Sequence, residues 1–197
     1  MYNVIEVVTI NSTLWNILVI LTRVLLPIKT GQEIAYWTGD DFWTEEHGYW
    51  CGVFFRYLPI EPNVVRDMFT GLYWLADPSK LGGVWGTPGN PSLMTWDEAI
   101  DACNKLELNG HYDWRLPNLR ELFSLIHAGK LDPAIEDGKF PNTKGYGYWS
   151  SSITPKDTSK VFGVDFVSGQ INWDPRVGIK KYARPCRGEY IDWWWAR

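Results

Sequence analysis

Side chains that could carry out catalysis are present, but their spacing forms no active-site pattern. The serine run Ser150-Ser151-Ser152 lacks the flanking glycines of a nucleophile elbow. The histidines His47, His111 and His127 have neither the His-x-x-x-His nor the His-Glu-x-x-His spacing of a zinc site. Because catalysis needs a nucleophile, a base and a stabilising group within mutual reach, we expect no catalytic residue and no enzymatic activity.

The cysteines do not indicate a metal site either. Cys51, Cys103 and Cys186 form no Cys-x-x-Cys pair and no zinc-type spacing. The chain also has no glycine-rich phosphate loop, so no metal and no cofactor is expected. The odd number of thiols leaves two alternatives open: one disulfide with one free thiol, or three reduced thiols.

Recognition of a ligand is the chemistry that the sequence favours. The segment 172–176, Asn-Trp-Asp-Pro-Arg, combines one aromatic anchor with hydrogen-bonding and charged neighbours, a composition suited to a binding surface. An ordinary polar hairpin is the alternative. The 13 tryptophans and 10 tyrosines of the chain exceed what a core of this size needs, and some of them are expected on the surface.

Two helices are predicted in the middle of the chain. Thr95 and Glu98 form a capping-box pattern, and the apolar spacing that follows reaches Leu106 before Asn109-Gly110 ends it. Asn118, with Glu121 three residues later, begins a second helix that we expect to continue to Gly129.

Strands and turns surround these helices. Residues 64–75 predict a strand pair that closes at Thr70-Gly71, and residues 77–92 predict a long loop, a usual place for recognition. Further strands are expected at 146–152, 161–166, 170–173 and 179–187, with a tight turn at Ser168-Gly169. This order of elements predicts an α+β fold.

Length and charge limit the classes of protein. The 197 residues suit one domain with an extension, and 45% hydrophobic with 21% charged residues suits a folded chain. The net charge is −4 and no lysine or arginine cluster exceeds two neighbours, so binding to nucleic acid through phosphate contacts is not expected.

The N-terminal stretch forms an apolar extension, residues 1–28, ahead of a ligand-binding domain at 29–197. Polar residues interrupt residues 4–26, and the longest clean run, 17–21, is far shorter than the about 20 residues of a membrane span. β-branched residues favour strands there. These strands would either hold copies of the chain together as a homo-oligomer, dock to a larger particle, or pack within the domain; a membrane anchor is not favoured.

Six ordered motifs together resemble the Lcl C-terminal domain family over about residues 55–190. They are Thr70-Gly71-Leu72-Tyr73-Trp74, the stretch 96–106, Asp113-Trp114-Arg115-Leu116-Pro117-Asn118 with Glu121-Leu122, Phe140-Pro141-Asn142-Thr143, Tyr148-Trp149-Ser150-Ser151-Ser152, and Val164-Asp165-Phe166 with Ser168-Gly169, Arg184 and Arg187-Gly188. The chemistry of Asp113-Trp114-Arg115 agrees, since it predicts an indole packed on the core with an ion pair beside it.

The resemblance implies a C-type-lectin-like fold of the formylglycine-generating-enzyme type, loop-rich, with two short helices and a small antiparallel sheet. Members of the family are largely binding modules of cell or virion surfaces, and some are variable proteins of diversity-generating retroelements in phages and archaeal viruses. A fixed scaffold would then present residues of about 146–180 to a protein or glycan receptor on a host or target surface. The expected exposed positions are Tyr146, Tyr148, Thr154, Lys156, Asp157, Lys160, Gln170, Asn172, Trp173, Asp174, Arg176 and Lys180.

The sequence departs from the family at two places. Pro59-Ile60-Glu61-Pro62-Asn63-Val64 replaces a glycine- and aspartate-rich turn, so the roughly six to eight oxygen ligands that calcium wants are not evident. Pro185 precedes Cys186 where relatives have a cysteine directly, and a disulfide between Cys103 and Cys186, which would suit the fold, stays open. A structural or virion-assembly knob, and a divergent formylglycine-generating-type oxidase, are the alternative functions.

Overall fold

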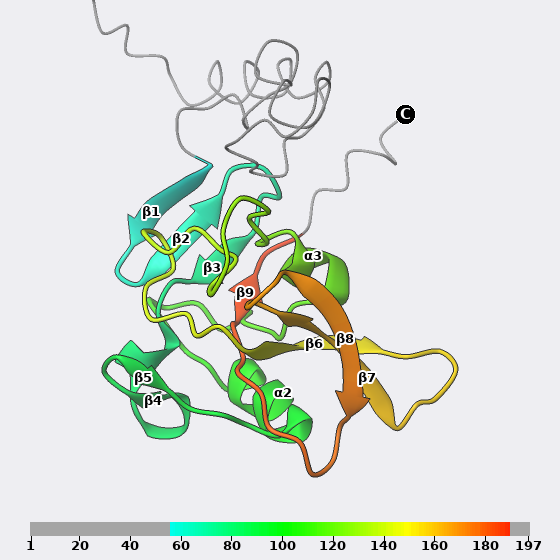
Figure 1. Ribbon diagram of the computed structural model, residues 1–197. Helices are drawn as coiled ribbons and strands as arrows, with labels where there is room; N and C mark the ends of the chain where they lie inside the picture. The colour runs from blue at the N-terminus through cyan, green and yellow to red at the C-terminus, as the bar shows by residue number, and fades with distance from the viewer. Residues whose placement is uncertain (1–55, 190–197) are drawn as a thin grey trace, which may run out of the picture.

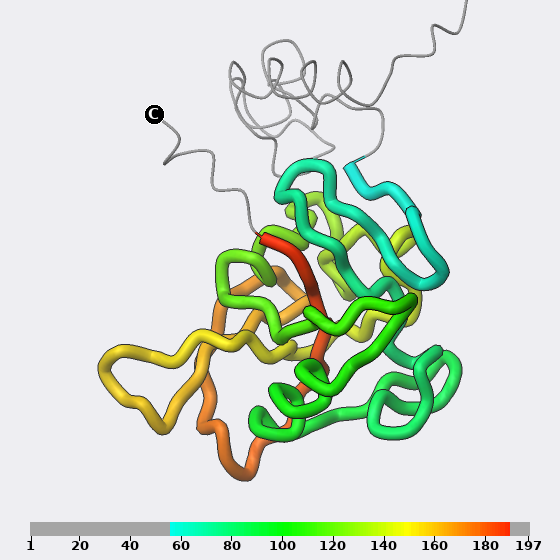
Figure 2. Tube along the Cα trace, turned by 180° about the vertical axis from the view of Figure 1, so that it is seen from behind, coloured from blue at the N-terminus to red at the C-terminus, as the bar shows by residue number. Residues whose placement is uncertain are grey.

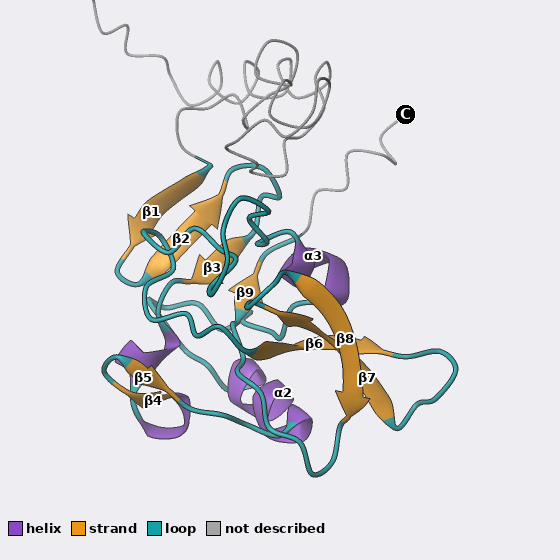
Figure 3. Cartoon of the chain, in the orientation of Figure 1, coloured by secondary structure: helices purple, strands orange, loops and turns teal. Residues whose placement is uncertain are grey.

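The computed structural model describes residues 56–189; the predicted extension 1–28 and the residues 29–55 and 190–197 lie outside the described residues. The described chain combines short helices with small antiparallel sheets joined by long loops (Figure 1, Figure 3). The predicted α+β class is therefore confirmed. No helix among residues 56–189 is long and apolar enough to cross a membrane.

A four-stranded antiparallel sheet holds both ends of the described chain. Its strands are β1 (Tyr57–Glu61), β2 (Val64–Asp67), β3 (Tyr73–Leu75) and β9 (Cys186–Arg187), in the order β1-β2-β3-β9. The predicted strand pair is β2 and β3. Its turn lies at Thr70-Gly71, where Gly71 has a φ of 80° that favours glycine.

The second sheet is a meander of β6 (Gly147–Ile153), β7 (Lys160–Asp165) and β8 (Gln170–Pro175). The predicted strands at 146–152, 161–166 and 170–173 correspond to these elements. β8 lies at the edge of this sheet, and the β6–β7 loop projects away from the body of the molecule (Figure 1).

Both predicted capping boxes are present. In α2 (Trp96–Asn104), the Thr95 hydroxyl accepts a bond from the Glu98 N–H, and the Glu98 carboxylate accepts one from the Thr95 N–H. Asn118 and Glu121 do the same for α3 (Leu119–Phe123). These side chains satisfy backbone donors that a helix start leaves unpaired.

Both helices are shorter than the sequence predicts. The expected helices reach Leu106 and Gly129, whereas α2 ends at Asn104 and α3 at Phe123. After each end the chain tightens: the N–H groups of Leu106, Leu125 and Ile126 bond to carbonyls three residues back instead of four.

The predicted long loop 77–92 contains short regular pieces. They are the 3-10 helices η2 (Pro78–Leu81) and η3 (Gly83–Trp85) and a hairpin of β4 (Gly86–Thr87) and β5 (Asn90–Pro91). Gly86 has a φ of 117°, and a Cβ there would lie 2.2 Å from the Asn90 carbonyl oxygen, so only glycine fits.

The predicted strand at 179–187 is wrong for most of its length, because only Cys186–Arg187 belongs to a sheet. Upstream, the Lys181 backbone pairs with Met94, and Tyr182 bonds to Gly147 and Trp149. The segment therefore crosses from one sheet to the other and ties both to the loop before α2.

Two groups of buried side chains form the core. One lies between the two sheets and α3 and includes Trp74 and Tyr148, and the other lies beneath α2 and includes Trp114 and Trp149. The predicted ion pair beside Trp114 is confirmed: the Arg115 guanidinium makes two bonds of 2.7 Å to the Glu121 carboxylate.

Both ends of the described chain leave the same side of the molecule, while the β4–β5 hairpin, α2 and the loop 176–180 lie at the opposite side. Figure 2 shows this arrangement from behind and agrees with Figure 1.

Candidate functional site

The predicted ligand-binding residues gather on the three-stranded sheet and its loops. Tyr146 precedes β6, and the β6–β7 loop with the start of β7 carries Thr154, Lys156, Asp157 and Lys160. β8 carries Gln170, Asn172, Trp173 and Asp174, and the loop after it carries Arg176 and Lys180. The base of the β6–β7 loop meets the end of β8, because Lys160 pairs with Pro175 and the Arg176 N–H bonds to the Ser159 carbonyl at 3.0 Å.

Two of these residues are buried, so the prediction that they are exposed is wrong. The Tyr148 side chain is 1% exposed, and its ring packs 4.8 Å from that of Phe166. Thr154 is also buried, and its hydroxyl donates to the Asp157 carbonyl at 2.6 Å. Tyr148 is enclosed because both faces of β6 are covered, one by each core cluster.

The other predicted positions reach the surface to different degrees. Tyr146, Lys156, Gln170, Trp173, Arg176 and Lys180 are exposed, whereas Asp157, Lys160, Asn172 and Asp174 are half-buried. Asp157 organises its own loop: its carboxylate accepts bonds from the N–H and hydroxyl of Ser159, which lower its pKa, and Lys160 lies 3.4 Å away.

The two faces of β8 carry different chemistry. Side chains alternate along a strand, so Asn172 and Asp174 point to one face of the sheet while Trp173 points to the other. The structure therefore does not bring the predicted aromatic and polar groups of β8 into one cluster.

On the polar face, β8 is held by a residue that the sequence did not single out. The buried Lys181 ammonium lies 2.7 Å from both the Asn172 amide oxygen and the Asp174 carboxylate. It also lies 4.7 Å from the centre of the Trp149 ring. The geometry fits a charge-assisted network closed by a cation–π contact.

Two glycines make room for this lysine. A Cβ at Gly163 would lie 3.0 Å from the Lys181 ammonium, and a Cβ at Gly147 would lie 3.0 Å from its side-chain carbons. Glycine inside a strand signals a close approach of another group. The two glycines could be read from the sequence, but they do not indicate that Lys181 is the residue that approaches them.

The other face of β8 is apolar and open. Trp173 pairs with Phe162 across the sheet and is 59% exposed, and Ile171 pairs with Val164 and is 43% exposed. α3 packs against β6 and β7 on this side, where Leu119 and Leu122 meet the cluster containing Val164. α3 does not cover β8, so Ile171 and Trp173 extend the apolar face of the sheet into solvent.

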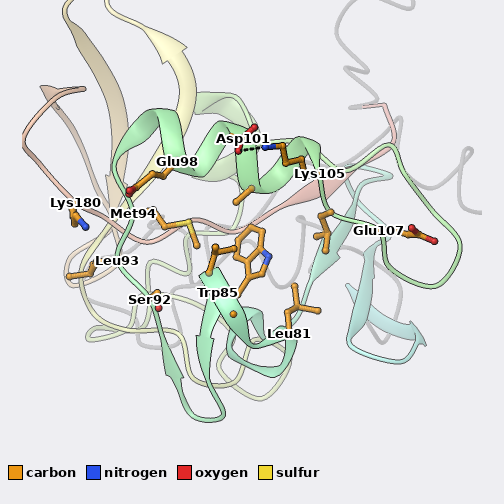
Figure 4. A pocket seen from close by; sticks show the side chains of 14 residues that line it. Leu81, Trp85, Ser92, Leu93, Met94, Glu98, Asp101, Lys105, Glu107 and Lys180 are labelled. Atoms are coloured by element: carbon orange, nitrogen blue, oxygen red, sulfur yellow. Dashed lines mark hydrogen bonds and ion pairs between the residues drawn. The ribbon is translucent and has the colours of Figure 1, made fainter.

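The loop after β8 borders a groove of about 790 Å³. Its floor is apolar, with Leu81, Trp85 and Met94, and Lys180 stands at one end near Glu98 and Leu93 (Figure 4). Its wall on the η2–β5 side comes from the segment for which the sequence predicted a recognition loop.

Charged groups at the groove are mostly held by neighbours. Asp101 pairs with Lys105 at 2.7 Å, and the Glu107 carboxylate accepts a bond of 2.7 Å from the Tyr112 hydroxyl. Glu98 caps α2, and its bonds to Thr95 lower its pKa. The groove can accept an apolar group between charged rims, a common arrangement for small ligands.

The residues considered for catalysis are held by the fold. The buried Ser150 hydroxyl donates to the Phe162 carbonyl at 2.8 Å, and the Ser152 hydroxyl accepts from the Leu119 N–H at 3.0 Å. His111 lies 3.4 Å from Glu61, and His47 lies outside the described residues. Among residues 56–189 no three His, Cys, Asp or Glu side chains group to hold a metal.

The two described cysteines are buried free thiols. Burial raises the pKa of both Cys103 and Cys186, with smaller contributions from Cys186 to Cys103 and from Glu121 to Cys186. The disulfide that the sequence left open is not formed between them, and Cys51 lies outside the described part of the chain.

Comparison with known families identifies this scaffold. The Lcl C-terminal domain matches residues 63–187, which span β2 to β9 and include every predicted site residue. The chain therefore belongs to the Lcl C-terminal domain family. A comparison with curated proteins finds no match.

Proposed function

We propose that this protein is a ligand-binding display protein of a virion or cell surface, without enzymatic activity. A C-type-lectin-like scaffold would present β8 and its adjoining loops to a protein or glycan receptor. In this proposal the exposed side chains of about residues 146–180 differ among variants of the gene in a population, as in variable proteins of diversity-generating retroelements.

The exposure of Trp173 carries the proposal. Of the tryptophans among residues 56–189, Trp74, Trp85, Trp114 and Trp149 are buried and Trp96 is half-buried; Trp173 alone is exposed. A large aromatic side chain left in water on a strand is a typical anchor for a partner.

The contrast between scaffold and surface supports the same proposal. β6 and β7 contribute Trp149, Val161 and Val164 to the core, whereas the exposed side chains of β8 and of the loop 176–180 have few packing constraints. Substitutions at the exposed positions would change recognition and leave the fold intact.

The binding test uses a screen of glycans and of receptor proteins against the full chain. Trp173→Ala and Arg176→Ala are each expected to weaken binding by roughly ten-fold or more, since truncating an anchor residue commonly costs about 2 kcal/mol. Tyr112→Ala is the matched control: it also removes an exposed aromatic ring, but Tyr112 lies between α2 and α3 and not on the β6-β7-β8 sheet, so affinity should not change. Full affinity in both the Trp173 and the Arg176 variant would exclude this surface as the binding site.

Sequencing the gene region for residues 140–190 from many clones of the source population tests variability. Substitutions confined to adenine-containing codons, with the helices unchanged, would support a diversified receptor-binding protein. A uniform sequence would favour a fixed adhesin or a structural knob. The oxidase alternative would need a redox-active pair of Cys51 and Cys186 near a metal; Cys186 is a buried thiol and Cys51 lies outside the described residues. Reversible oxidation of this pair in the full chain would favour the oxidase.

A further inference from the structure

The outer edge of β8 is open among the described residues. In the order β6-β7-β8, β8 pairs with β7 on one side, and no strand within residues 56–189 pairs with its other side. An antiparallel strand directs about half of its backbone N–H and C=O groups away from its partner. The edge therefore offers a row of hydrogen-bonding groups to a further strand.

Two polar side chains of β8, Asn172 and Asp174, are already engaged. Lys181 binds the side-chain oxygens of Asn172 and Asp174, the groups best suited to sugar hydroxyls. A ligand that used these oxygens would have to displace a buried ammonium from its bonds, at a large cost. Asn172 and Asp174 thus serve the scaffold.

The apolar face remains free to receive side chains. Ile171 and Trp173 alternate with the Lys181-bound residues, and Phe162 lies beside Trp173 on β7. Phe123, at the end of α3 on the same side of the sheet, is also exposed. A strand placed beside β8 would direct every second side chain toward this surface.

We propose that β8 docks an extended segment of a protein partner, which adds as the next strand and packs apolar side chains against Ile171 and Trp173. The inference rests on the proposed function and narrows its receptor to a protein. Pro175 has no N–H and ends the usable edge, so the pairing stretch is residues 170–174.

The experiment uses the full chain and a displayed library of short linear peptides with alternating apolar positions. Each selected peptide is resynthesised with one backbone nitrogen methylated at a time, and its Kd is measured. Methylation at alternate positions should weaken binding about ten-fold or more, and methylation between them should have little effect. Trp173→Ala should weaken binding similarly, while Tyr112→Ala should not.

Other outcomes overturn the inference. Peptides that bind without a two-residue period, or independently of Trp173, do not add as a strand on β8. Trp173-dependent binding of a glycan with no selected peptide overturns the strand and leaves the display function standing. A Trp173-dependent dimer in light scattering assigns the edge to a second copy. No Trp173-dependent ligand in any screen removes both proposals.

Discussion

Lys181 places a positive charge in the interior, and three neighbours make this tolerable. Its ammonium binds Asn172 and Asp174 and faces the Trp149 ring, so the cost of leaving water is offset by short bonds. Gly147 and Gly163 provide the space. Lys181 therefore fixes the positions of Asn172 and Asp174 from a buried site that a surface ligand would not touch.

Lys181→Met keeps the length of the side chain and removes its charge. We expect the free energy of unfolding to fall by about 1 to 3 kcal/mol, because Asp174 and Asn172 lose their partner but can still reach water. Urea unfolding measures the loss. Lys180→Met, at the exposed neighbouring position, should change stability by less than about 0.5 kcal/mol, and equal effects of the two variants would contradict this role.

The buried thiols give a prediction of chemical reactivity. Because burial raises the pKa of Cys103 and Cys186 above the ordinary value of 9.0, both stay protonated in the folded state. At about pH 8 we expect alkylation of both residues, followed by peptide mass spectrometry, to be slow in native protein and fast after unfolding. Fast native labelling of either residue would contradict the buried assignment.

The same shift sets a direction for stability. A folded state that holds its thiol protons longer than the unfolded state is fully stabilised below pH 9.0 and loses stability as the pH rises further. Unfolding curves below and above that pH should show this decline, and replacing both cysteines by serine should reduce it.

Residue-level prediction succeeded where one local pattern decides the outcome. Trp114 beside its ion pair and Trp173 on the surface were predicted, since each depends on a short stretch of chain. The burial of Tyr148 was not predicted, because its exposure was inferred from the family resemblance and not from its surroundings. Clusters formed by distant residues cover both faces of β6.

At the scale of elements, residues close together in sequence determine where the helices start, but not where they end. The capping boxes at Thr95 and Asn118 need only residues three positions apart, so sequence reasoning located both. The helix ends and the crossing of residues 179–187 depend on partners such as Met94 and Gly147, which lie far away in sequence.

Asn118→Ala tests the cap of α3. The change removes the 2.9 Å bond to the Glu121 N–H and should lower the free energy of unfolding by about 1 kcal/mol. Asn118→Ser retains an oxygen that can cap the helix and should restore most of the loss. If alanine and serine behave alike in urea unfolding, the cap does not stabilise α3.

At the scale of the whole molecule, the order of strands and helices predicted the α+β class and the local pair of β2 and β3, but not the pairing of strands that lie far apart in sequence. β9 joins β3 across more than half of the described chain, and no local pattern specifies that contact. Alternation along β8 separates Asn172 and Asp174 from Trp173, but the contact of Lys181 with the two polar side chains is a tertiary one that the sequence does not specify.

The apolar N-terminal stretch bears on the oligomeric state of the full chain. We propose that the apolar stretch 4–26 holds copies together, since isolated apolar strands need a partner surface. Light scattering should then give an oligomer for the full chain and a monomer for a chain lacking residues 1–27. An unchanged mass after removal would show that this stretch does not join copies.

The four-stranded sheet also brings the first and last strands of the described residues close together. β1 and β9 are its two edge strands and run antiparallel, so the start of β1 and the end of β9 lie at the same end of the sheet, about 14 Å apart at normal strand spacing. A unit with neighbouring entry and exit points can be spliced into a surface loop of an unrelated host protein. A host protein that carried this fold in a surface loop would have α2 and the loop 176–180 on the side facing away from it.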